Sequence, residues 1–149
     1  MRTSAAVNEA FVRRERIALS CKGSHVIVHA AENKAREIGV PECIAVVDAA
    51  GELLAFSRMD EARPGSIEIA LVKARSAARR RRATADEGGG DGFTHVRLAL
   101  ASHLNVTGIG GGLPILFEGQ TIGGVGVSSG PSEQDTVVAQ AGIDALLQG

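Results

Sequence analysis

The sequence is poor in aromatic residues: its 149 residues include four Phe and neither Trp nor Tyr. Proteins that bind single-stranded nucleic acids stack the bases on aromatic side chains, so this scarcity argues against that class. An excess of positive charge is lacking as well, because 16 Lys and Arg are balanced by 17 Asp and Glu, which gives a formal net charge of −1. A nucleic-acid partner is therefore not expected.

Cysteines and long apolar runs are also scarce. The two cysteines, Cys21 and Cys43, cannot form a disulfide framework or a four-ligand zinc site. No apolar run approaches the roughly 20 residues of a membrane-spanning helix. Charged residues interrupt the N-terminal segment, so it lacks the continuous apolar core of a secretory signal. We therefore expect a cytoplasmic protein without a membrane partner.

The periodicity of the apolar residues predicts a single domain in which helices alternate with β-hairpins. The expected helices cover 20–38, a segment from Pro64 to the Arg79–Arg82 run, part of 93–104, and 129 to almost the end of the chain. The expected strands cover 42–48, 52–58, 113–117 and 120–127. Since hairpins pair antiparallel, these elements favour the α+β class, with an antiparallel sheet of about five strands built from two hairpins and flanked by helices. Residues 1–18 are expected to form an arm or short helix, and 19–149 the domain.

Several linked sequence blocks resemble the GlcG/HbpS family, which includes the C-terminal domain of PduO-type proteins. The blocks are Ile38-Gly-Val-Pro41, Ile44-Ala-Val-Val-Asp48, Arg58-Met-Asp60, Lys73-Ala74, Gly111-Gly-Leu-Pro-Ile115 and Gly126-Val-Ser128, within residues 19–147. The resemblance implies a homo-oligomer, from dimer to octamer. It also implies haem binding, as in several members of the family. Together with the histidine pair described next, it leads us to expect binding of haem, or of a similar planar ligand with carboxylates, at a subunit interface. The alternative that it implies is an enzyme or accessory factor of glycolate- or diol-type catabolism.

His25 and His29 lie four residues apart in the first expected helix and therefore share a face. That face is opposite the apolar stripe that includes Ile27 and Ala31. Two outward imidazoles can bind a metal ion, or one of them can ligate haem iron where two subunits meet. The alternative is an ordinary solvated helix face.

Arg58, Asp60 and Lys73 are the other candidate site residues. Arg58 follows the second strand, where a guanidinium can pair with a carboxylate of haem or of a small hydroxy acid. It can equally form a surface pair with Asp60. Lys73 lies in a largely apolar helix, where a desolvated amine can act as a base, or can pair with an acid such as Asp48 or Glu68. The three residues are the candidate catalytic set of the alternative function.

Glycines are concentrated in the second half of the chain. The Gly123-Gly-Val-Gly126 segment runs into a strand, so it does not fit the strand–glycine loop–helix context of a dinucleotide site. We expect these glycines to allow close approach of backbones within the sheet or at an interface. The Arg79–Arg82 run is expected to be a charged helix end.

Overall fold

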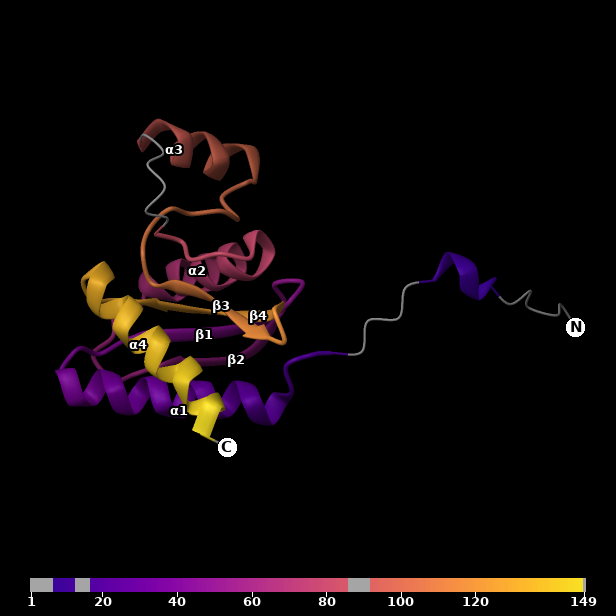
Figure 1. Cartoon of the computed structure of the whole chain (residues 1–149). Coiled ribbons are helices and arrows are strands. Elements are labelled where there is room, and N and C mark those ends of the chain that lie inside the picture. The colour runs from indigo at the N-terminus through magenta and orange to yellow at the C-terminus, as the bar shows by residue number, and fades with distance from the viewer. Residues whose placement is uncertain (1–6, 13–16, 86–91, 149) are drawn as a thin grey trace, which may run out of the picture.

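The chain folds into an antiparallel sheet with helices on both faces (Figure 1), which confirms the predicted α+β class. The computed structural model describes residues 7–12, 17–85 and 92–148. Its helices are η1 (Glu9–Phe11), α1 (Cys21–Ile38), α2 (Ser66–Arg80), α3 (Gly92–Ala101), α4 (Ser132–Asp144) and η2 (Ala145–Gln148). Its strands are β1 (Cys43–Asp48), β2 (Leu53–Arg58), β3 (Gly112–Phe117) and β4 (Gln120–Ser128). No described helix is both long and apolar enough to cross a membrane.

In the described part of the chain the sheet has four strands in the order β2-β1-β4-β3, and every neighbouring pair is antiparallel. Both predicted hairpins are present, but the expectation of about five strands was wrong. The glycine-rich segment before β3 adds no strand, because it bends and places Gly111 at φ 117°, outside the range of a strand. Within the predicted arm, η1 occupies Glu9–Phe11, while residues 1–6 and 13–16 lie outside the described residues.

The first long helix begins and ends where local chemistry predicts. The Ser20 hydroxyl accepts a hydrogen bond from the Gly23 N–H at 3.0 Å and caps the N-terminus of α1. Gly39 follows the last turn in the left-handed conformation, at φ 71°, which glycine adopts without a steric cost. These two caps fix the position of α1, and therefore the direction in which its side chains point.

Alternate residues of β1 are buried on opposite faces of the sheet. Ile44 and Val46 face the core shared with α1 and α4, whereas Ala45 and Val47 face the core shared with α2. Figure 1 shows this arrangement, with α1 and α4 on one side of the sheet and α2 on the other. Burial on both faces explains why β1 reads as a continuous apolar run.

The α2 side of the sheet is built from alanine and glycine. A Cβ atom on Gly126 would lie 3.0 Å from the Ala74 Cβ, and one on Gly124 would lie 3.0 Å from the Ala78 backbone nitrogen. The glycines of β4 therefore let α2 approach the strand more closely than side chains would allow. This confirms the prediction that they serve close backbone approach.

Candidate functional site

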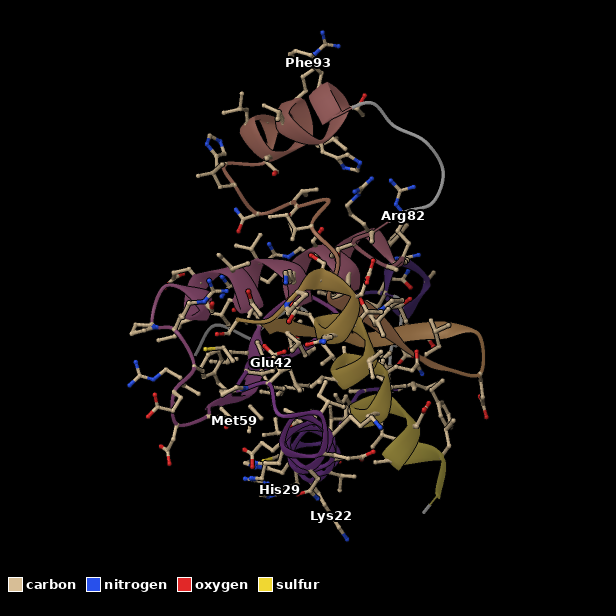
Figure 2. The ribbon with its side chains drawn as sticks, turned by 90° about the vertical axis from the view of Figure 1, so that its left-hand side faces the viewer. Lys22, His29, Glu42, Met59, Arg82 and Phe93 are labelled. Atoms are coloured by element: carbon tan, nitrogen blue, oxygen red, sulfur yellow. The ribbon has the colours of Figure 1, made fainter. Side chains whose placement is uncertain are left out.

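The outward face of α1 carries the two histidines, as the helical spacing predicts. His25 and His29 are both exposed, and Figure 2, which looks along α1, shows His29 directed away from the sheet. Glu32 and Arg36 follow at helical spacing on the same face, and the Arg36 guanidinium donates to the Glu32 carboxylate at 3.2 Å. No group of three or more His, Cys, Asp and Glu that could hold a metal ion occurs within the described ranges.

A groove of about 500 Å³ lies between the C-terminal half of α1 and the end of β2. We call it the α1–β2 groove. It is lined by Glu32, Ala35, Arg36, Gly39, Val40, Pro41, Ser57, Arg58, Met59 and Asp60. The helix face that carries the histidines thus continues, through Glu32 and Arg36, into this groove. Two of the candidate residues, Arg58 and Asp60, therefore share one surface depression.

Arg58 is an exposed cation that forms no ion pair with any residue the structure describes. Among the residues that the structure describes, neither Arg58 nor Asp60 forms an ion pair, so the predicted alternative of an Arg58–Asp60 surface pair is not formed. The positive charge of Arg58 nevertheless affects a buried group. Burial raises the pKa of the Cys43 thiol, and Arg58 opposes part of that rise. The guanidinium is therefore available to a carboxylate that enters the groove.

Lys73 is in the protein interior and does not line the groove. Its side chain is only 2% exposed, and its ammonium donates to the Asp135 carboxylate at 2.9 Å and to the Val127 carbonyl at 2.7 Å. The predicted pairing with an acid is therefore present, but the acid is Asp135, and Asp48 and Glu68 were the wrong candidates. Asp48 instead caps the β1–β2 turn by accepting from the N–H groups of Ala50 and Glu52, both at 2.9 Å.

Glu42 is a charged residue whose burial the sequence analysis missed. It is fully buried at the start of β1, and neither of its carboxyl oxygens has a hydrogen-bond partner among the described residues. Its pKa is raised from 4.5 to about 8; burial is the largest cause and the nearby Asp135 carboxyl adds to the rise, whereas the Gly130 backbone and Lys73 oppose it. The sequence signal for the burial of Glu42 was its position between Pro41 and an apolar strand, because a strand that is buried on both faces leaves no solvated position.

The Arg79–Arg82 run lies at the C-terminal end of α2, and part of it holds the neighbouring hairpin. The Arg79 Nε atom donates to the Ala50 carbonyl at 2.7 Å, and Arg75, one turn earlier, donates to the Gly51 carbonyl at 3.1 Å. These contacts attach the β1–β2 turn to α2. The observed role is therefore structural, in keeping with the predicted charged helix end.

Residues 19–144 match the sequence profile of a family described as "Haem degrading protein HbpS-like". Among curated proteins, the chain is 38% identical over 124 residues to an uncharacterised 15.0 kDa protein from the dhaT-dhaS intergenic region of Citrobacter freundii; the match covers 82% of this chain and 87% of the relative. It is 36% identical over 115 residues to protein GlcG of Escherichia coli, which covers 77% of this chain and 84% of GlcG.

A solved structure of a PduOC:haem complex has a similar fold. It superposes with a TM-score of 0.76 at 33% identity, over 87% of this chain and 95% of the other.

Proposed function

Because the chain belongs to the HbpS-like family, we propose that it is an oligomeric protein that binds haem, or a similar planar ligand with carboxylates, at an interface between subunits. The observation that carries the proposal is the continuous surface formed by the histidine face of α1 and the α1–β2 groove. The similarity to a structure described as a haem complex supports the choice of ligand.

In this proposal His29 or His25 ligates the iron. The described residues place no third His, Cys, Asp or Glu ligand beside the two histidines. Two ligands make a poor site for a bare metal ion, which needs a larger donor set. Haem brings the porphyrin nitrogens itself, so one imidazole of this pair would be enough for the protein to hold the iron. When bound, haem would supply a redox-active iron. The part of this chain is to hold and orient that group.

Arg58 is the proposed partner of the ligand's carboxylates. It is the lining cation of the groove that forms no ion pair within the described part of the chain. Arg36 contributes positive charge nearby, although its guanidinium is already shared with Glu32 and Asn33. A guanidinium binds a carboxylate through paired hydrogen bonds, which would fix the orientation of the ligand.

The test is a haemin titration of the purified protein, followed by the Soret band. We expect saturable binding that the His25→Ala/His29→Ala double variant loses. His103→Ala is the matched control, because His103 is also exposed but lies outside this face. Undiminished binding by the double variant would remove both histidines as ligands. Zn²⁺ in place of haemin tests the metal-only alternative at the same two residues.

Exposed apolar side chains on α3 support the oligomeric part of the proposal. Figure 1 shows α3 standing apart from the sheet, beyond α2. Phe93 is 72% exposed, Val96 55% and Leu100 67%. Apolar surface of this kind is normally covered by protein, and we propose that a second copy of the chain covers it. Sedimentation should give a multimer that Phe93→Ser/Leu100→Ser dissociates, and a monomeric native protein would contradict this part.

The alternative, an enzyme of glycolate- or diol-type catabolism, has less support. Its candidate residues Lys73, Arg58 and Asp60 do not line a common cleft, because Lys73 is enclosed beside Asp135 while the other two face the groove. The remaining support is the pair Arg58 and Asp60, which can bind a small hydroxy acid without Lys73.

A further inference from the structure

Three ionisable side chains from three separate elements meet in the interior. Lys73 comes from α2, Asp135 from α4 and Glu42 from the start of β1, and each residue is at most 1% exposed. One Asp135 oxygen accepts from Lys73 at 2.9 Å, and the other accepts from the Gly130 N–H at 3.1 Å. Figure 2 shows Glu42 deep in the molecule, between α1 and α2.

The charges of this cluster do not balance when every member is ionised. Two carboxylates would then share one ammonium, and Glu42 would remain without a donor. An unpaired buried carboxylate is strongly unfavourable, and like charges side by side favour protonation of one of them. A proton on Glu42 makes the cluster neutral and gives this carboxyl a hydrogen to donate to Asp135.

We propose that Glu42 and Asp135 share a proton beside Lys73, and that this buried proton site controls the wall of the α1–β2 groove. Its regulatory meaning rests on the proposed function of the groove, whereas the proton site itself can be tested without any ligand.

The connection to the groove is short and direct. The Glu42 backbone carbonyl accepts from the Met59 N–H at 3.0 Å, and Met59 lines the groove. Val40 and Pro41, which immediately precede Glu42, line it as well. A Cβ atom on Gly130 would lie 2.7 Å from Glu42 Oε1 and 2.6 Å from the Val40 Cγ1, so this region has no spare volume. An ionised Glu42 therefore has to move, or to admit water, at the expense of this packing.

The groups around Glu42 agree with a proton held at neutral pH. Asp135 faces it from α4 and favours protonation, whereas Lys73 on α2 and the Gly130 backbone favour ionisation. Burial is the largest influence, and the pKa rises from its ordinary value of 4.5 to about 8. Cys43, the next residue of β1, has a thiol pKa that burial raises above 9.0, so it titrates after Glu42.

Methyl NMR provides a direct test, because Met1 and Met59 are the two methionines of the chain. Methionine-methyl labelling therefore gives two signals, and Met59→Leu assigns the one in the groove. We expect the Met59 signal to shift sigmoidally with a midpoint near pH 8, and Glu42→Gln to abolish that shift. Glu37→Gln is the control, since Glu37 is an exposed member of α1 outside the groove. If the chemical shift of Met59 does not change with pH, or changes in the same way in Glu42→Gln, the proposal that the proton site acts on the groove wall is overturned.

If Glu42→Gln does not fold, the proton site can still be tested by infrared spectroscopy of the native protein. Its infrared spectrum should contain the carbonyl band of a protonated carboxylic acid at pH 7, which disappears above pH 9. The unfolded chain releases this proton near pH 4.5 and the folded chain near pH 8. Between these values the folding equilibrium constant should fall by up to tenfold per pH unit relative to Glu42→Gln. Absence of the band at pH 7 overturns the proton site.

Discussion

Replacement of Lys73 by Met should destabilise the protein strongly, whereas replacement of Lys34 by Met should have little effect. Both lysines form ion pairs of nearly equal length, 2.9 Å from Lys73 to Asp135 and 3.0 Å from Lys34 to Glu37. They differ in environment. The Lys73 and Asp135 side chains are each 2% exposed, whereas those of Lys34 and Glu37 are 28% and 69% exposed. The comparison therefore contrasts a buried ion pair with an exposed ion pair of nearly the same length.

The degree of burial determines how much free energy of unfolding each substitution is expected to cost. Removal of one partner from a buried pair leaves the other charge uncompensated and costs about 3–5 kcal/mol. Removal of an exposed partner on a helix costs about 0.3–0.5 kcal/mol. For a chain of this size, the first loss lowers the melting temperature by roughly 6–20 °C. Urea unfolding at pH 7 measures both losses, provided that the m-values of the variants agree.

A double variant completes the test. Lys73→Met/Asp135→Leu removes both charges, and it should recover much of the stability that Lys73→Met loses, because apolar replacement of a whole buried pair is often neutral. Equal stability losses for Lys73→Met and Lys34→Met would show that burial does not make the Lys73–Asp135 pair more important for stability than the exposed pair. If Lys73→Met instead increased the stability, Lys73 would be a residue that the protein keeps at a cost in stability, as active sites do, and its catalytic role would be the favoured interpretation.

Two further predictions concern the close packing of α2 and the charge of the groove. Gly126→Ala should cost about 3 kcal/mol in the free energy of unfolding, because the new methyl meets the backbone of α2. Gly65→Ala should change it by less than about 1 kcal/mol, since its Cβ would meet nothing within 4 Å. Arg58→Gln should weaken haemin binding about tenfold with unchanged stability, as measured by the Soret titration; equal affinity would exclude Arg58 as the carboxylate partner.

The elements of the fold could be predicted because their signals are local. Ser20 and Gly39 mark the ends of α1 through bonds and dihedral angles within a few residues of each end. The turn of the first hairpin follows from Asp48, which bonds the next residues of the same turn. The outward direction of His25 and His29 follows from their spacing relative to the buried residues of the same helix. The family resemblance, carried by linked short blocks, was confirmed as well.

The interior polar cluster could not be predicted because its contacts join distant segments. Lys73 and Asp135 are 62 residues apart, and the candidate acids Asp48 and Glu68 were chosen because they lie closer to Lys73 in the sequence. Asp135 is an acidic residue in the first turn of α4, and nothing in the sequence around it indicates that it also pairs with a lysine of another helix. The lack of a fifth strand depended on the backbone conformation at Gly111, which glycine permits but does not require.

Comparison of Arg58 with three other cations of the chain shows why a positive charge alone does not identify a binding residue. Lys73 is neutralised by Asp135, Arg36 is shared with Glu32, and Arg63 donates to the Ser129 carbonyl at 2.9 Å. A carboxylate ligand that recruited any of these would have to displace an existing partner, and would gain only the difference between the two interactions. Arg58 has no partner to displace within the described residues. Of these four cations, Arg58 is therefore the one at which a carboxylate would gain most.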